Sequence, residues 1–391
     1  MKKHSTIHPG SGAGVFMAII SCLFLSNLAV GQANSSYNAN SIPVNGQYNI
    51  AFGFQAMLNT STGLENSGMG YRALYTNTTG STNSAYGAFS LFGNTTGNNN
   101  TGMGFQASYN NSIGSFNSAF GSNALAVNSG SYNTASGYEA LYSSNASSYN
   151  TANGSLALYS NTSGSGNLAS GFQALHANTS GSNNSAHGMN SLYSNTIGNN
   201  NTVDGNRALY LNISGNNNSA LGDSAGLNSL GSGNVFVGHR AGANETGNNK
   251  MYIGDDANKT LIYGDFSSGQ VLLGKPDVAG YIFKGTRTLN VLGGILADSM
   301  RVALSGDWAD GVFNKNYPLK PLQELEQYIS VNKRLPGVPS ANDIAISGIN
   351  VAELDAKLLE KIEELTLYVL ELKKENQQQQ EEINKLKSQK K

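Results

Sequence analysis

A unit of 17 residues recurs through the middle of the chain, and its most regular feature is the pattern Asn-x-(small)-x-Gly. Asn83-Ser-Ala85-Tyr-Gly87 is a clear copy. A fixed period of this length predicts a solenoid, because one unit cannot bury its own apolar residues and neighbouring units must stack. The spacing slips to 16 at only two steps, and the recurring glycines are Gly53, Gly70, Gly87, Gly104, Gly121, Gly137, Gly154, Gly171, Gly188, Gly205, Gly222 and Gly238.

Alternation inside the unit predicts a short strand. Asn83, Ala85 and Gly87 fall on one face of it, and Ser84 and Tyr86 fall on the other. We expect a second short strand or bend in the other half of the unit, then a turn at Asn-Thr-Thr-Gly, where Asn and Gly would adopt left-handed φ. Alanine and glycine would let backbones approach closely, and leucine and the aromatic residues would fill the core.

These patterns predict a mainly β protein. The expected architecture is a parallel β-solenoid of about twelve 17-residue coils, followed by a small α/β segment and a C-terminal coiled-coil helix. A solenoid presents a repeated surface and rarely builds a single reactive pocket.

Charge is nearly absent from the repeats, although the whole chain has a formal net charge of −1. Without a basic face the array is not expected to bind nucleic acid. Isolated histidines (His176, His187 and His239) predict no metal site, and Gly68-Met-Gly70 lacks the lysine of a phosphate-binding loop. We therefore expect no cofactor. The charged residues between positions 48 and 238 are Glu65, Arg72, Glu139, Asp204, Arg207 and Asp223.

The acidic residues of the array do not predict an enzyme. A glycan hydrolase of tail-spike type needs two carboxylates in one cleft. Glu65, Glu139, Asp204 and Asp223 stand at least nineteen residues apart and on different coils. No catalytic residue is assigned, and the hydrolase remains the least favoured alternative.

The N-terminus has the pattern of an export signal. Lys2 and Lys3 precede an apolar run from 15 to 30, and Ala29-Val-Gly31 supplies small residues for cleavage. Cys22, the only cysteine, lies in the segment expected to be removed, and no later segment is long and apolar enough to span a bilayer. The sequence thus predicts an exported protein at the cell surface or in the extracellular space, with association to an outer membrane as an option.

Composition divides the chain into six parts. We expect a signal peptide over 1–31, a polar lead over 32–47, the repeat head over 48–254, a β-rich junction over 255–304, a small Trp-containing module over 305–350 and a coiled coil over 351–391. In the small module Trp308, Val312, Phe313 and Tyr317 are expected to form a core against a helix that begins near Pro321. The apolar stripe of that helix is Leu322, Leu325, Tyr328 and Ile329.

The last helix is predicted to self-associate. Asn350 and Glu353 match a capping box, and an apolar heptad pattern with flanking Glu and Lys follows. The residues expected at the two seam positions are Leu358, Ile362, Leu365, Val369, Leu372, Asn376, Gln379, Ile383 and Leu386. Ile or Val alternating with Leu, and a buried Asn, favour two strands.

Two segments resemble known families. The Asn-Ser-Ala-x-Gly-x-x-Ala-Leu repeats are similar to the head of YadA-like trimeric adhesins, over about half the chain. Leu289-Asn-Val-Leu-Gly293, Gly306-Asp-Trp308-Ala-Asp310 and Leu335-Pro-Gly337-x-Pro339 resemble a module of secreted Bacteroidetes proteins of tail-fibre type. The first resemblance implies a left-handed β-roll that packs as a homotrimer; together they imply a surface or secreted fibre. The membrane-anchoring barrel segment of those adhesins is not matched.

The expected function is that of a structural or adhesive fibre. A homotrimer would make many weak, neutral contacts with surface glycans or other cell-surface components. The alternative is a binding module for a periodic surface such as ice or a crystalline polysaccharide. Such a surface needs one repeated residue, but we expect one row to mix threonine with other residues, namely Thr60, Thr78, Thr95, Asn111, Ser129, Thr179 and Asn212.

Overall fold

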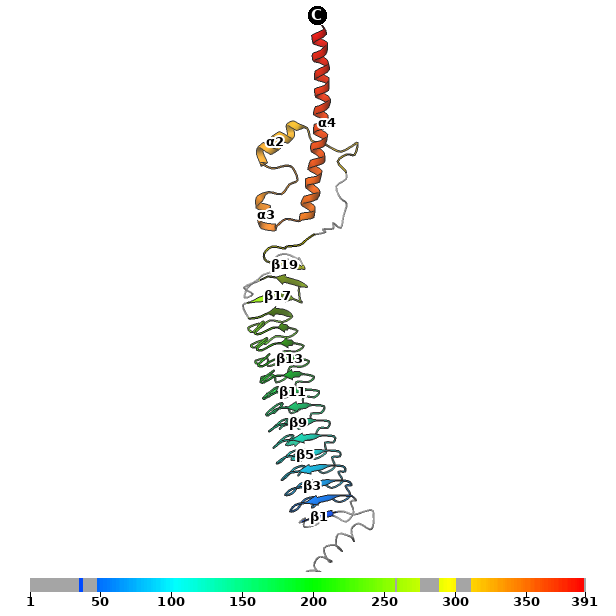
Figure 1. The fold of residues 1–391 in the computed structure, drawn as a ribbon, viewed down its shortest axis with the longest axis vertical. Coiled ribbons are helices and arrows are strands. Elements are labelled where there is room, and N and C mark those ends of the chain that lie inside the picture. The colour runs from blue at the N-terminus through cyan, green and yellow to red at the C-terminus, as the bar shows by residue number, and fades with distance from the viewer. Residues whose placement is uncertain (1–34, 38–47, 257–258, 275–287, 300–310, 390–391) are drawn as a thin grey trace, which may run out of the picture. The chain divides into compact units, whose positions relative to one another are not determined.

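The computed structural model confirms a parallel β-solenoid with three helices after it (Figure 1). It describes residues 35–37, 48–256, 259–274, 288–299 and 311–389. The chain divides into two compact units, 1–294 and 295–391. The expected export signal, Cys22 and Trp308 lie outside the described residues.

Each coil contributes one strand of three residues, and the first coil is taken to begin at Asn49. Each strand pairs in parallel with the strand of the next coil, so that Ala51 lies beside Gly68 and Gly68 beside Ala85. Residues at the same position in successive coils therefore form a row along the solenoid. The strands are β2 Ile50–Phe52, β3 Ser67–Met69, β4 Ser84–Tyr86, β5 Thr101–Met103, β7 Ser118–Phe120, β9 Thr134–Ser136, β10 Thr151–Asn153, β11 Leu168–Ser170, β12 Ser185–His187, β13 Thr202–Asp204, β14 Ser219–Leu221 and β15 Val235–Val237.

The core of the solenoid is narrow. Each coil buries the small residue in the middle of its strand, together with a pair such as Ala73-Leu74 in its second half. The expectation that aromatic residues fill this core is wrong for most of the array. Among the described residues of unit 1, the buried aromatic side chains are Phe236, Tyr252 and Tyr263, at its C-terminal end.

Phe236 shows why aromatic residues are excluded elsewhere. It occupies a strand position that is alanine in most coils, and Gly226 and Gly242 stand where other coils have leucine. A Cβ added to Gly226 or to Gly242 would lie 2.6 or 2.4 Å from the Phe236 ring. A ring fits inside only where two neighbouring side chains are removed, since interiors are close-packed.

Two rows of buried asparagines run beside this core. In the first row, the backbone N–H of Asn66 donates to Oδ1 of Asn49 at 2.9 Å, and its Nδ2 donates to the carbonyl of Gly80 at 2.9 Å. These bonds satisfy buried polar groups that a wider apolar core would leave unpaired. We call this row the first asparagine ladder: Asn49, Asn66, Asn83, Asn100, Asn117, Asn133, Asn150, Asn167, Asn184, Asn201, Asn218 and Asn234.

The second asparagine ladder lies at the turn of each coil: Asn77, Asn94, Asn111, Asn128, Asn161, Asn178, Asn195 and Asn212. Asn94 Nδ2 donates to Asn77 Oδ1 at 2.7 Å and to the Gly97 carbonyl at 3.0 Å. Ser144 interrupts the row, and Thr60 and Ser229 stand at its two ends. The buried hydroxyls of Thr60 and Ser229 have no hydrogen-bond partner among the described residues.

The expected turn geometry is wrong in its details. Asn77 and Gly80 do not have positive φ; Asn77 Nδ2 instead donates to the Gly80 carbonyl at 2.8 Å. Left-handed φ recurs just before the first ladder, as at Thr82, and twice in the second half of the coil, as at Phe89 and Leu91. That second half is mostly turns, and the short pair β6 Asn110–Asn111 and β8 Val127–Asn128 is the only strand pairing described there.

The recurring glycine is required by backbone proximity. Gly87 has φ +128°, and a Cβ on it would lie 2.5 Å from the carbonyl oxygen of Gly104 in the next coil. Because the obstacle is backbone, it cannot move aside as a side chain would. This contact explains why the pattern keeps glycine while the residues on either side vary.

Both ends of the array carry further strands. β1 Ser35–Tyr37, within the expected polar lead, pairs in parallel with β2. At the other end β16 Lys250–Gly254 continues the stack, and then β17 Thr260–Asp265 and β18 Gln270–Leu273 turn back as antiparallel strands, followed by β19 Leu289–Val291. The antiparallel strands cover the edge that the last parallel strand would otherwise expose.

The described residues of unit 2 form three helices: α2 Leu322–Asn332, α3 Ala341–Ser347 and α4 Val351–Gln389. The predicted capping box of α4 is only partly present. The Glu353 N–H lies 3.5 Å from Asn350 Oδ1, and Asn350 Nδ2 donates to Glu353 Oε1 at 2.7 Å, a side-chain bond in place of the one that a capping box makes to the backbone N–H of the cap residue. α3 was not predicted, although Ser340 and Asp343 form a capping box. No described helix combines the length and the apolar character that crossing a bilayer requires.

The predicted core of the small module is only partly observed. Val312 is buried, but Phe313 is exposed, and no residue of α2 is buried. Tyr317 and Tyr368 instead attach this segment to α4: the Tyr317 hydroxyl donates to Glu364 at 2.5 Å and the Tyr368 hydroxyl donates to the Lys320 carbonyl at 2.6 Å.

Candidate binding surfaces

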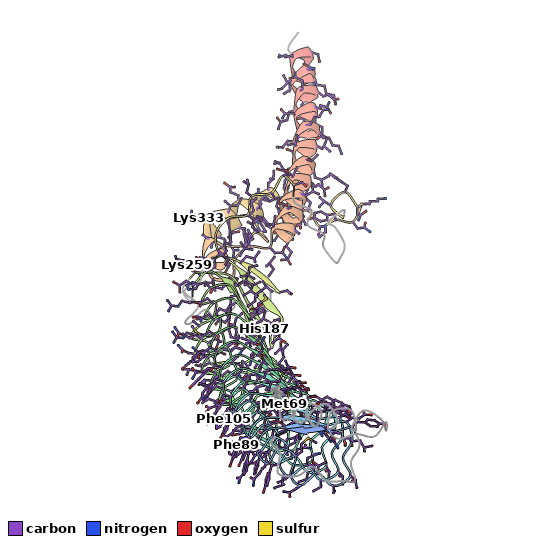
Figure 2. All side chains as sticks on the ribbon, turned by 60° about the horizontal axis from the view of Figure 1, so that its bottom comes forward. Met69, Phe89, Phe105, His187, Lys259 and Lys333 are labelled. Carbon is purple, nitrogen blue, oxygen red and sulfur yellow. The ribbon has the colours of Figure 1, made fainter. Side chains whose placement is uncertain are left out.

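The first five coils expose an apolar surface on the two rows that flank the recurring glycine, extended by Ile50 at the start of β2. Each of its side chains is 38–50% exposed. Figure 2 labels Met69 and Phe105, two of its members. Large apolar patches of this kind mark contact surfaces. We call it the apolar strip: Ile50, Phe52, Phe54, Met69, Tyr71, Tyr86, Met103, Phe105 and Phe120.

The same rows change chemistry along the solenoid. After Phe120 the strand row continues with Ser136, Asn153 and Ser170, and then with His187 and Asp204. Apolar side chains return to this row at Leu221 and Val237, and the row after the glycine keeps Tyr138, Phe172 and Met189. Exposed apolar residues are thus dense in the first coils and scattered beyond them.

A second aromatic row runs along the second half of the coils and is half-buried. Tyr142, Tyr159, His176, Tyr193 and Tyr210 stack with ring centroids 5.0–5.3 Å apart. Burial between two tyrosines lowers the pKa of His176, because it disfavours the charged imidazolium. This row stiffens the array and leaves little ring face free for a ligand.

A third group of rings is exposed. Phe116, Tyr132 and Tyr149 occupy the position just before the first asparagine ladder in three successive coils. Their ring centroids lie 4.9 and 5.0 Å apart and their planes differ by 5° and 2°. We call these residues the exposed aromatic stack.

The threonine row differs from the row expected from the sequence. Thr60 lies in the second asparagine ladder with Asn111 and Asn212, whereas Thr78, Thr95 and Thr179 lie one position further on, with Ser129. The hydroxyls of these three threonines donate to carbonyl oxygens of the next coil at 2.6–2.9 Å. Since those donors are already used, the row offers fewer groups to an external periodic surface.

The acidic residues of the array lie on its outside. Asp204 and Asp223 are on neighbouring coils, and Asp223 Oδ1 lies 3.7 Å from His239 Nε2 at an exposed position. Glu65 and Glu139 belong to earlier coils, which are not neighbours of those two. Within the described residues no three His, Cys, Asp or Glu side chains form a group that could hold a metal ion.

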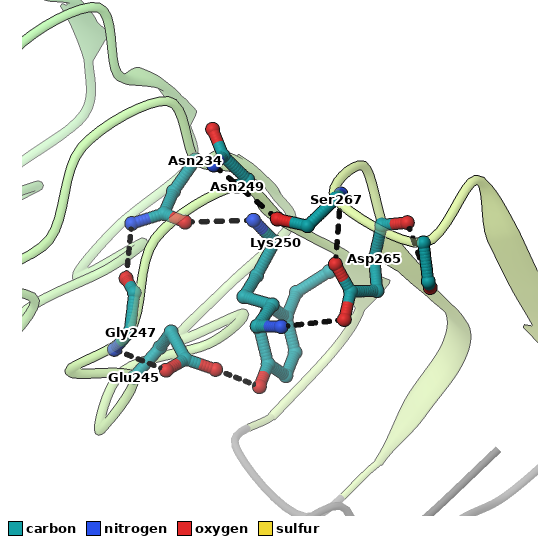
Figure 3. Close-up of polar contacts among 9 residues, drawn as sticks. Asn234, Glu245, Gly247, Asn249, Lys250, Asp265 and Ser267 are labelled. Atoms are coloured by element: carbon teal, nitrogen blue, oxygen red, sulfur yellow. Dashed lines mark hydrogen bonds and ion pairs between the residues drawn. The ribbon is translucent and has the colours of Figure 1, made fainter.

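A charged cluster closes the C-terminal end of the array (Figure 3). Lys250 takes the place of an asparagine in the first ladder, and Glu245 takes the corresponding place in the second. Lys250 Nζ lies 2.8 Å from Asp265 Oδ2, and the Tyr252 hydroxyl donates to Glu245.

The geometry of this cluster is that of a structural cap. The hydrogen bond from Lys250 holds the pKa of Asp265 below its ordinary value. Burial raises the pKa of Tyr252, and the bond to Glu245 raises it further. The charged side chains of the cluster are thus bonded within it, and the cluster ends both asparagine ladders.

The self-association residues predicted on α4 lie together on one exposed stripe. Leu358, Ile362, Leu365, Val369, Leu372, Ile383 and Leu386 are each 43–62% exposed, and Asn376 is also exposed. The neighbouring stripe of α4, with Lys357, Lys361, Glu364 and Tyr368, lines a polar cavity of about 250 Å³ against Tyr317 and Pro336. Each of these four residues directly precedes a seam residue. The stripe of α4 that packs on the module and the stripe that carries the seam are therefore adjacent.

Sequence reasoning missed the exposed aromatic stack and the apolar strip, because it assigned the aromatic residues to the core. The signal was present: the Tyr of Ser84-Ala-Tyr86 was placed on the face opposite the buried Ala85. Comparisons with protein families, with curated proteins and with solved structures find no match for this chain.

Proposed function

We propose that this protein is an exported structural or adhesive fibre that assembles from several copies of the chain, with three copies as the expected number. The solenoid would supply a long, nearly neutral surface, and α4 would hold the copies together. Many weak contacts along such an assembly add up to strong attachment without a deep pocket.

The exposed seam of α4 carries this proposal. Seven large apolar side chains lie on one stripe of a helix whose neighbouring stripe already packs on its own module. An apolar stripe at heptad spacing is stable in water when it is covered by a second helix of the same kind. The module does not cover the seam, so another copy of the chain is the occupant that fits.

The apolar strip supports a second contact between copies. It lies on the first five coils, far from α4 in the sequence. In a parallel assembly each row of the strip would face the same row of another copy. The resemblance to trimeric adhesin heads favours three copies, whereas the Ile/Val and Leu pattern of α4 favours two. The larger head contact is proposed to decide the number.

Sedimentation equilibrium of residues 32–391 tests the assembly. We expect three times the monomer mass, and a lower mass for the Ile362→Asp, Val369→Asp double variant, because each aspartate would bury a charge in the seam. The matched control, Gln377→Asp with Gln378→Asp, adds the same charge on the outer side of the helix and is expected to keep the wild-type mass. A monomeric wild type, or equal masses for both variants, would contradict the proposal.

A further inference from the structure

We propose that Tyr149 and the space beside Gly166 form a binding site for one sugar ring of a neutral polysaccharide. The inference deepens the proposed adhesive function and rests on it. It assigns part of that adhesion to the C-terminal end of the exposed aromatic stack.

The stack ends at Tyr149 because the next coil has no side chain at this position. β10 and β11 pair with Thr151 beside Leu168, which brings Gly166 to the place where a fourth ring would stand. Tyr149 is 66% exposed, against 49% for both Phe116 and Tyr132. Tyr132 has a ring on each side, whereas the outer face of Tyr149 is free.

Asn183 bounds the space from the other side. A Cβ built on Gly166 would lie 2.6 Å from Asn183 Oδ1, so the amide of Asn183 leans into the position that Gly166 leaves empty. Successive strands are about 4.8 Å apart. Because Asn183 Oδ1 already approaches the Cβ position of Gly166, a sugar ring would stack on the outer face of Tyr149 further from the backbone, with the Asn183 amide at its inner edge.

The two walls match the chemistry of a pyranose. One side of the sugar ring carries mainly C–H groups, which pack on an aromatic face, and its hydroxyls lie around the edge, where an amide can donate and accept hydrogen bonds. Between Arg72 and Asp204 the only charged side chain is Glu139. Because the surrounding surface carries almost no positive charge, it favours an uncharged sugar over phosphorylated or acidic ligands.

The chain contains a matched control position. Gly233 also precedes the first asparagine ladder, has the same φ of +70° as Gly166, and faces Asn249 Oδ1 at 2.5 Å from its virtual Cβ. The residue before it in the row is Asn217, so the same space exists there without an aromatic wall.

The test measures retention of residues 32–391 on insoluble cellulose, mannan and chitin, with alginate gel as the acidic comparison. Gly166→Asn fills the space with the residue that neighbouring coils carry at this position, and Tyr149→Asn removes the ring. We expect the wild type to bind at least one neutral polysaccharide, both variants to bind about tenfold more weakly, as removal of a stacking contact implies, and Gly233→Asn to bind like the wild type.

The proposal is overturned if none of the three neutral polysaccharides retains the wild type, if Gly166→Asn binds as well as wild type, or if alginate is preferred. Sedimentation of the same variants separates this result from the assembly claim. A wild type that binds sugar as a monomer would keep the site and reject the fibre. An assembled wild type that binds no sugar would reject the site alone.

Discussion

At the scale of the residue, the fold depends on amides that are buried and satisfied. Each asparagine of the first ladder links three coils: Asn167 Oδ1 accepts from the N–H of Asn184 at 3.0 Å, its Nδ2 donates to Gly181 at 2.8 Å, and its N–H donates to Asn150 at 3.0 Å. An unpaired buried polar group costs more than a hydrogen bond gains. The ladders therefore specify register as well as stability.

Asn167→Ala is expected to lower the free energy of unfolding by about 2–4 kcal/mol, because it leaves the Asn184 N–H without a partner and removes one of the two donors to the Gly181 carbonyl, which keeps Asn178 Nδ2. Urea unfolding followed by circular dichroism measures this loss. Ser163→Ala, at an exposed position of the previous coil, serves as the control with little change.

Thr60→Asn is expected to raise the free energy of unfolding by about 1 kcal/mol, because it extends the second asparagine ladder by one residue. A loss of stability in this variant, measured by the same urea unfolding, would contradict the account of that ladder.

At the scale of the element, the coil was predictable in outline and not in detail. The period and the alternation in Ser84-Ala-Tyr86 placed Ala85 and Tyr86 on opposite faces of a short strand, and the structure buries Ala85 and exposes Tyr86. Asn77 was interpreted as a turn residue, since asparagine is common in turns, and its burial in a ladder depends on neighbouring coils that one unit does not show. The exposed aromatic stack depends likewise on which residues become neighbours after stacking.

The cap at the end of the solenoid is expected to be sensitive to acid. The pKa of Asp265 is lowered in the folded state, so its ion pair stabilises the cap above the ordinary aspartate value of about 3.9 and that contribution is lost as pH falls below it. The fall in melting temperature between pH 6 and pH 3 should be smaller in the Lys250→Gln, Asp265→Asn double variant than in the wild type. Equal falls would show that the pair contributes nothing.

At the scale of the whole molecule, the solenoid behaves as a stack of equivalent coils whose stability comes from nearest-neighbour contacts. The α4 seam and the apolar strip then provide surfaces through which copies of the chain would meet. The number of copies was not predictable from one chain, because the heptad pattern and the head resemblance favour different answers.

Deletion of one complete coil, residues 167–183, should keep both asparagine ladders in register and preserve the β signal in circular dichroism. Deletion of residues 167–174 alone should shift every later coil out of register and expose ladder amides. Thermal unfolding compares the two. The account requires the longer deletion to be the milder one, and the reverse order would reject it.

Hydrogen–deuterium exchange along the array tests the stacked ladder most directly. The account predicts slow exchange that recurs with the 17-residue period, in each strand and in the N–H of each first-ladder asparagine from Asn66 to Asn234, with faster exchange at the exposed turns between them. Uniformly fast exchange over residues 49–249, without that period, would contradict it.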